Sequence, residues 1–263
     1  MTVWIGTSWK MNKTLAEAVD YAGGLRQALS GRSLGSVQPF IIPPATALAS
    51  VAGVLDGTSV LVGAQNAHWE DAGAWTGEVS VPQVSDAGAR LVEIGHSERR
   101  EHFGETDETV RKKVDATLRH GLIPLLCIGE PDEVHNAGTS SEYILEQARR
   151  ALDGLEDALL AKVLIAYEPI WAIGAGGRPA HPDELRAPFA ALAGTFGGRV
   201  AGLLYGGSVD LANASGLLDL PHVDGLFVGR AAWALEGYVQ LLDLAAGLAG
   251  GDERRSEMEG VDQ

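Results

Sequence analysis

The chain has 263 residues, 46% of them hydrophobic, which is enough to bury the core of one large α/β domain. Its 20 basic and 35 acidic residues give a formal net charge of −15. This charge argues against nucleic acid or an anionic membrane as a partner, because both bind a basic face. The single cysteine, Cys127, excludes a disulfide framework, and no apolar run approaches the ~20 residues of a membrane span. We therefore expect a cytoplasmic protein that makes no contact with nucleic acid or membrane.

Short apolar runs rich in Val, Ile and Leu recur along the chain. They are continuous rather than alternating, which is typical of parallel strands covered on both faces. We predict strands over eight segments: 3–9, 39–42, 60–65, 90–95, 123–128, 163–167, 201–205 and 225–228.

Helical segments lie between these runs. Thr14 with Glu17, and Thr139 with Glu142, have the spacing of a capping box, and Thr106 precedes a third helical segment. The pattern predicts that each threonine caps the helix that follows it.

Two prolines mark a later helix. Pro182 suits its first turn, whereas Pro188 should break or kink it. Eight strand–helix units over about 250 residues match a (β/α)₈ barrel, whose active site is built at the carboxyl ends of the strands. We predict one such domain over 1–250. Residues 251–263 are polar and carry five acids against two arginines, so we expect a disordered tail there.

The most informative segment is LIAYEPIWAIGAGG (164–177), in which an apolar strand delivers Glu168 and then enters a glycine-rich loop. A buried carboxylate is costly unless it does chemistry, and a glycine-rich loop can close over a ligand and offer N–H groups to a phosphate. Other strands of the predicted barrel also end in polar side chains or glycines, which would meet at one rim: Lys10, Asn66, His96, Glu130, Ser208 and the pair Gly229–Arg230.

Each of the three most reactive residues also has an ordinary structural interpretation. Lys10 fits a solvated loop lysine, His96 a satisfied core histidine, and Glu168 an ion-pair partner of Arg99 or Arg100. Together, a Lys, a His and a Glu at three strand ends favour a catalytic site, because glycine loops also follow the last two strands, where barrels bind phosphate.

The chemistry that suits these parts is proton transfer beside a carbonyl. A glutamate without a nucleophilic Ser or Cys removes the α-proton, while Lys and His stabilise the oxygen on which charge develops. A lid excludes water from this step. No metal or other cofactor is required.

Seven motifs occur in order: SWKMN (8–12), GAQN (63–66), GHSERR (95–100), FGETDE (103–108), CIGE (127–130), YEPIWAIG (167–174) and YGGSV (205–209). In these motifs, over nearly all of residues 3–245, the chain resembles the triosephosphate isomerase family. The resemblance implies a TIM barrel and a cofactor-free isomerase of a small phosphorylated ketose or aldose.

The resemblance also implies roles for individual residues. Lys10 would be the electrostatic clamp, His96 the electrophile, Glu168 the base and Glu98 a support near Lys10. The phosphate would be held by a second group: Gly174, Ser208, Gly229 and Arg230.

Two further residues carry expectations about the lid and about assembly. The family is usually a homodimer in which the loop after the third strand enters the neighbour's active site, and Thr76 in GAWTGE (73–78) matches that loop. Tyr205 matches a tyrosine that closes on a backbone N–H of the lid. Here the matching position is Pro179, which has no N–H, so we expect Ala180 or Gly177 to replace it.

Three departures from the family pattern bear on the substrate. Ser8 stands where the family has Asn, Gly229–Arg230 where it has Gly-Gly, and GGRPA (176–180) where it has a sequence close to GKTA. With GAWTGE (73–78) and VGRAAW (228–233), they resemble the erythrulose-phosphate isomerases, a branch that serves tetritol breakdown. This implies conversion of L-erythrulose 1-phosphate to D-erythrulose 4-phosphate, with Ser8 leaving space and a hydroxyl for the extra carbon.

Two alternatives stay open. In the first, Ser8 is tolerated drift in an ordinary triosephosphate isomerase of glycolysis, which interconverts D-glyceraldehyde 3-phosphate and dihydroxyacetone phosphate. In the second, the barrel only binds a phosphate ligand. Intact Lys10, His96 and Glu168 argue against the second, because a binding module gains nothing from a poised base.

Overall fold

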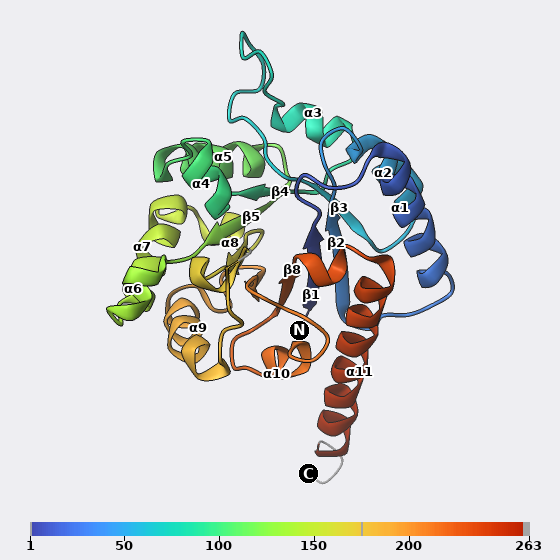
Figure 1. Cartoon of the computed structure of the whole chain (residues 1–263), viewed down its shortest axis with the longest axis vertical. Helices are drawn as coiled ribbons and strands as arrows, with labels where there is room; N and C mark the ends of the chain where they lie inside the picture. Colours follow the sequence, from blue (N-terminus) through green and yellow to red (C-terminus); the bar gives the residue numbers. More distant parts are fainter. Residues whose placement is uncertain (1, 175, 260–263) are drawn as a thin grey trace.

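The computed structural model describes residues 2–174 and 176–259. Eight parallel strands form a closed barrel in sequence order, with β8 pairing back onto β1 (Figure 1). This confirms the predicted (β/α)₈ barrel, and the strand ends differ from the sequence prediction by no more than two residues. The strands are β1 (Val3–Ser8), β2 (Val37–Ile42), β3 (Leu61–Ala64), β4 (Leu91–Ile94), β5 (Ile123–Ile128), β6 (Leu164–Tyr167), β7 (Gly202–Tyr205) and β8 (Gly225–Val228).

Helices surround the barrel (Figure 1). They are α1 (Leu15–Leu29), α2 (Leu48–Leu55), α3 (Val81–Asp86), α4 (Ser97–His102), α5 (Asp107–Arg119), α6 (Asp132–Asn136), α7 (Ser140–Leu152), α8 (Asp157–Leu160), α9 (Pro182–Phe196), α10 (Ala214–Leu218) and α11 (Leu235–Glu259), with two short 3₁₀ helices, η1 (Ile170–Ala172) and η2 (Arg230–Ala232). Among the described residues, none of the helices is long and apolar enough to cross a membrane.

Two of the three predicted helix caps form. The capping box of α1 is present: the backbone N–H of Thr14 donates to Glu17 Oε2 at 2.7 Å, and the Thr14 side chain accepts from the Glu17 N–H. Thr106 caps α5 in the same way. The prediction for Thr139 is wrong, because its side chain accepts no hydrogen bond from α7. Its hydroxyl instead donates to the carbonyl of Val134, in the preceding turn, at 3.4 Å.

The prolines of α9 were expected to start the helix at Pro182 and to break or kink it at Pro188, and of these the break does not occur. Pro182 lies in the first turn as expected, but the helix runs through Pro188 without a break. Pro188 removes one helical hydrogen bond. It is itself buried, and so are its neighbours Leu185 and Phe189, so packing holds the helix where the backbone bond is lost.

The helix at the C-terminus begins at Leu235 and its backbone continues to Glu259. Part of the segment expected to be a tail, 251–259, therefore lies within the helical span. Residues 260–263 lie outside the described residues, so a disordered tail there stays a prediction.

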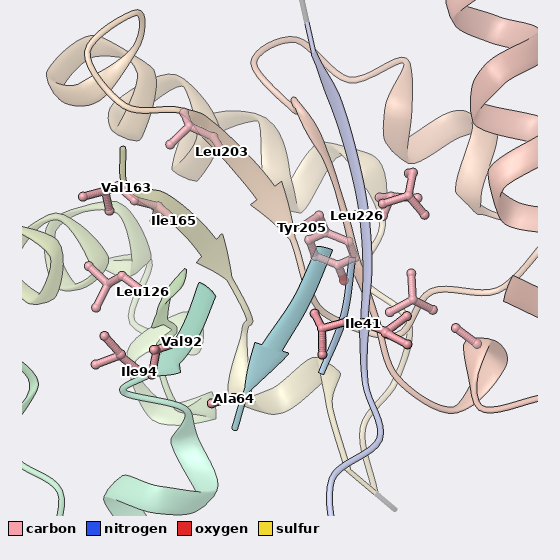
Figure 2. Close-up of a cluster of buried hydrophobic side chains, with 14 of the residues drawn as sticks. Ile41, Ala64, Val92, Ile94, Leu126, Val163, Ile165, Leu203, Tyr205 and Leu226 are labelled. Carbon is pink, nitrogen blue, oxygen red and sulfur yellow. The ribbon is translucent and has the colours of Figure 1, made fainter. Parts of the chain in front are cut away.

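Side chains alternate between the inside and the outside of the barrel. The outer layer packs against the helices, and Figure 2 shows part of it, including Val92, Ile94 and Leu126. The inner layer contains large apolar side chains such as Phe40 and Phe227, whose rings stack at 5.8 Å. Gly6 leaves room for this layer, because a Cβ there would lie 1.9 Å from Phe40 Cζ. These side chains fill the barrel below its rim, and in this fold the site is built at the carboxyl ends of the strands.

Candidate active site

A cavity of about 540 Å³ opens at the carboxyl ends of the strands. It gathers most of the side chains that the sequence singled out. The predicted residues that line it are Ser8, Lys10, His96, Glu98, Glu168, Gly174, Ser208, Gly229 and Arg230. Of the other predicted residues, Thr76 and Tyr205 do not line it.

Glu168 follows β6 directly and is 5% exposed. Its Oε2 lies 3.6 Å from His96 Nε2 and accepts no hydrogen bond from any described residue. Its Oε1 faces Gly206, where a Cβ would lie 2.7 Å from that oxygen, so only glycine leaves space for the carboxylate. Burial, with a smaller effect from the charge of Glu93, raises the pKa of Glu168 to about 8. The carboxyl group is therefore poised to exchange a proton near neutral pH.

The alternative in which Glu168 pairs with an arginine is wrong. Arg99 Nε donates to Glu105 Oε2 at 2.8 Å, and Arg100 pairs with Asp107 at 2.7 Å. Both arginines are thus committed to other carboxylates, and Glu168 is left facing the cavity.

His96 caps α4, and its ring orientation is fixed by the backbone. The N–H of Glu98 donates to His96 Nδ1 at 3.1 Å, so in the neutral ring the proton is on Nε2, which faces Glu168. Burial and then the positive charge of Lys10 lower the pKa of His96 well below its usual range. His96 is therefore a neutral hydrogen-bond donor to whatever occupies the cavity.

Lys10 follows β1 in a strained backbone conformation, with φ of 51°. Its carbonyl accepts from Gln65 Nε2 at 2.8 Å, and its Nζ is 2.6 Å from Glu98 Oε1. Burial raises the pKa of Glu98, but the hydrogen bond and charge of Lys10 outweigh it and lower the pKa overall. The ammonium group is thus held at the cavity by an ionised carboxylate, as expected for Glu98.

One site residue was missed by the sequence analysis. Glu93 points into the barrel from β4, is 4% exposed and lines the cavity. Ser8 Oγ donates to Glu93 Oε2 at 2.8 Å, and burial raises the pKa of Glu93 to about 7. The signal was present in the sequence, since LVEI (91–94) places a charge in the middle of an otherwise apolar strand.

Two polar residues at strand ends have structural partners. Glu130 Oε1 accepts from the Tyr167 hydroxyl at 3.0 Å and from Trp171 Nε1 at 2.8 Å, which anchors η1 at the start of the glycine-rich loop. Asn66 Oδ1 accepts from Lys113 Nζ at 2.7 Å. Neither residue lines the cavity described above.

The loops after β6, β7 and β8 form the opposite side of the cavity. Ser208 donates both its N–H and its hydroxyl to the carbonyl of Ala172, at 3.0 and 2.8 Å, which ties the β7 loop to η1. Gly174 has a φ of 76°, which favours glycine. The Arg230 side chain is exposed and has no hydrogen bond or ion pair with any described residue. It is a cation free to meet an anionic ligand.

The second half of the glycine-rich loop is anchored by Arg178. Its guanidinium makes two hydrogen bonds to Glu184, at 2.8 and 2.6 Å, and lies over the Trp171 ring at 4.4 Å. The buried Tyr205 hydroxyl makes no hydrogen bond with the described residues. Burial raises its pKa, and the backbone N–H of Ala180 is close enough to lower it in part. Ala180 is one of the two partners expected for this hydroxyl, and a hydrogen bond between them in the closed lid stays a prediction.

A second cavity, of about 560 Å³, adjoins the first. The two share Ser8, Lys10, Glu93, His96 and Glu98. Met11 (97% exposed) and Phe103 (68% exposed) line the second cavity. The loop that carries Thr76 projects from the barrel between β3 and α3 (Figure 1), and residues 70–79 are exposed. Thr76 therefore does not reach the site of its own chain.

The chain matches the family model described as triosephosphate isomerase over residues 3–245. It is 64% identical over 245 residues to the L-erythrulose-1-phosphate isomerase of Mycolicibacterium smegmatis, with 93% of each chain covered. It is 53% identical over 243 residues to the protein of the same name from Brucella abortus, with 91% of this chain and 94% of the relative covered. Its fold matches the crystal structure of triosephosphate isomerase from Bartonella henselae with a TM-score of 0.81 and 32% identity, covering 93% of this chain and 99% of that one. The barrel, the site motifs and these similarities agree: the chain belongs to the triosephosphate isomerase family.

Proposed function

We propose that this protein isomerises L-erythrulose 1-phosphate to D-erythrulose 4-phosphate through an enediolate. The observation that carries the proposal is the geometry at Glu168, whose Oε2 has no hydrogen bond within the described chain and faces the neutral His96 beside Lys10. The names of relatives that are 50 to 64% identical support the four-carbon substrate.

The substrate is a ketose whose carbonyl, C2, is next to the carbon that bears the phosphate. Its phosphate would lie against the loops that carry Gly174, Ser208, Gly229 and Arg230, where Arg230 offers a free positive charge and the glycines allow close approach. The reacting carbons then lie in front of Glu168.

The reaction moves one proton between two carbons. The Glu168 carboxylate removes the proton from C3, and the C–H electrons form the C2=C3 double bond while the C2 carbonyl electrons move onto oxygen. Lys10 and the Nε2–H of His96 stabilise that oxygen as charge develops on it. His96 passes a proton between the two oxygens, and Glu168 returns its proton to C2. The carbonyl is then at C3.

The glycine-rich loop supports this proposal as a lid. Water would compete for the enediolate, and four residues of this loop border the cavity beside Glu168: Ile173, Gly174, Gly177 and Pro179. Its stem is held by Glu130 and its far end by Glu184, so the segment between can close over the phosphate.

The decisive experiment is an assay of the purified protein on L-erythrulose 1-phosphate and on D-glyceraldehyde 3-phosphate. We expect kcat/KM for the four-carbon substrate to be well above that for the triose. A wide preference for the triose would overturn the four-carbon assignment and restore triosephosphate isomerase. Binding of both without turnover would leave a phosphate-binding barrel.

We further propose that the protein acts as a cytoplasmic homodimer in tetritol breakdown. The exposed loop around Thr76 and Trp75 (47% exposed), with the second cavity and its exposed Met11 and Phe103, supports a loop exchange between two copies. Light scattering should give twice the chain mass, and Thr76→Asp with Trp75→Asp should give monomers with low activity. A monomeric, fully active wild type would contradict this.

A further inference from the structure

Glu93 is a buried carboxylate that the proton-transfer chemistry does not use. It lies on β4 between Val92 and Ile94, which face outward into the layer shown in Figure 2, so Glu93 faces the barrel interior. Its neighbours in that interior, such as Leu91 and Leu125, are apolar. Burying a carboxylate in such surroundings costs stability, which is explained if the carboxylate binds a ligand.

The partners of Glu93 do not supply that reason. Ser8 donates one hydrogen bond to Oε2 at 2.8 Å, and no other hydrogen bond or ion pair from the described residues reaches the carboxylate. Lys10, a cation that lines the same cavity, is committed to Glu98 at 2.6 Å. Oε1 of Glu93 is therefore a free acceptor in a residue that lines the cavity. A buried carboxylate with one neutral partner can take a hydroxyl donor from a ligand.

The position of Glu93 fits the end of the substrate away from the phosphate. In a closed ring of eight strands, β4 lies across from β8, whose loop carries Gly229 and Arg230. Glu93 lies within β4, whereas His96 follows the end of that strand and caps α4, so Glu93 lies below His96, toward the cavity floor. A substrate whose phosphate lies at these loops and whose reacting carbons lie beside Glu168 therefore has its other end on the side of Ser8 and Glu93. That side borders both cavities.

We propose that Glu93, oriented by Ser8, accepts a hydrogen bond from the terminal hydroxyl of the four-carbon substrate and is the residue that selects it over a triose phosphate. This inference rests on the proposed function. L-erythrulose 1-phosphate carries a hydroxymethyl group where dihydroxyacetone phosphate carries a hydrogen. Only the larger substrate places a donor at Oε1, and a site built to bind a hydroxyl discriminates against the analogue that lacks it.

The test compares kcat/KM for L-erythrulose 1-phosphate with kcat/KM for dihydroxyacetone phosphate. The wild type, Glu93→Gln, Glu93→Leu and Ser8→Ala are measured on both substrates, and the ratio of the two values is compared. The charge of Glu93 raises the pKa of Glu168, so removing it changes turnover of both substrates. That shared effect cancels in the ratio, so a change in the ratio reports only on binding of the fourth carbon and its hydroxyl.

We expect the ratio to fall by about 10- to 100-fold in Glu93→Leu, and by less in Glu93→Gln, which keeps one acceptor oxygen. Ser8→Ala should lower it least, because it only loosens the carboxylate. Leu204→Val is the matched control, since Leu204 lies in the same barrel interior but outside both cavities, and its ratio should equal that of the wild type.

The outcomes separate the two levels of the hypothesis. A wild type that prefers the four-carbon substrate, with the same ratio in every Glu93 variant, would overturn the role of Glu93 alone. A wild type that prefers the triose would overturn the proposed function. If Glu93→Leu fails to fold by circular dichroism, the near-isosteric Glu93→Gln decides, and an unchanged ratio there counts against the inference.

Discussion

Buried carboxylates lie on both sides of the barrel wall near β4, and they differ in how many hydrogen-bond and ion-pair partners they have. Outside the barrel, the Glu105 side chain accepts from Arg99 at 2.8 Å and from the Gly95 N–H at 3.2 Å, and pairs with the buried Lys113 at 3.2 Å. Inside, Glu93 has one neutral partner, and Glu168 Oε2 has none among the described residues.

The number of partners distinguishes a carboxylate that stabilises the fold from one that is available for binding or proton transfer. A buried carboxylate surrounded by cations and N–H groups keeps its charge and fixes the fold around it. A buried carboxylate without them has a raised pKa and costs stability, but it is free to bind or to move a proton. Glu93 lies on β4, and Glu105 lies between α4 and α5 but accepts from Gly95, just after the end of β4. The same Glu-to-Gln substitution should therefore have opposite effects on stability at the two positions.

The largest effect is expected at Glu168. Glu168→Gln should lower kcat by about 10²- to 10⁴-fold, because the base is lost while the shape of the side chain is kept. Steady-state assays on the preferred substrate measure this. Glu168→Asp, which keeps the charge but withdraws it by about one methylene, should also lose a large factor. An unchanged kcat in both variants would mean that another group is the base.

The next effect is on stability and concerns Glu105. Glu105→Gln leaves the buried Lys113 without a carboxylate, and breaking such a pair costs about 3 to 5 kcal/mol. Urea denaturation of the variant and the wild type gives the difference in the free energy of unfolding. Glu146→Gln, which removes an exposed pair with Arg150, serves as the control and should change stability far less. Equal losses in the two variants would contradict the comparison.

A substitution at Ser8 tests the role of the Ser8–Glu93 pair in substrate specificity. Ser8→Asn fills space beside Glu93 and restores the amide found elsewhere in the family, so the preference for the four-carbon substrate should narrow by about 10- to 200-fold. Arg230→Gly is the control, since both substrates carry the phosphate and their kcat/KM values should fall together. A preference that changes more in Arg230→Gly than in Ser8→Asn would place the selection at the phosphate loop instead.

The smallest effect is the pH dependence of stability. Glu93 has a pKa raised from 4.5 to about 7 in the folded protein, so the folded state holds its proton more tightly than the unfolded state. The free energy of unfolding should therefore fall as pH rises from about 4.5 to about 7. Glu93→Gln removes this titrating group. The free energy of unfolding of the variant, relative to that of the wild type, should therefore rise by on the order of 1 to 3 kcal/mol between pH 5 and pH 8.

Thermal or urea unfolding at the two pH values measures that gain. Glu168 contributes the same trend in both proteins, so it largely cancels from the comparison. A variant that loses stability relative to the wild type at pH 8 would mean that Glu93 is a paired structural carboxylate like Glu105.

The sequence alone determined the barrel and most of its reactive rim. Continuous apolar runs can be covered on both faces only in a parallel sheet between helices, and the eight predicted strands occur in that order. Lys10, His96 and Glu168 were found because each stands where a strand ends, and parallel strands all end at the same rim. The caps at Thr14 and Thr106 were found because they depend only on residues three apart.

Only the tertiary structure decided what depends on contacts between distant segments. Ser8 and Glu93 are 85 residues apart, and no local pattern says that one donates to the other. Thr139 has the spacing of a cap, but its hydroxyl donates to the carbonyl of Val134 instead. Pro188 stays within a helix because it packs among buried side chains. In a strand that is apolar on both faces, the sequence does not tell which face meets the cavity. The direction of Glu93, and with it the floor of the site, is therefore set by how the strand is placed in the closed barrel.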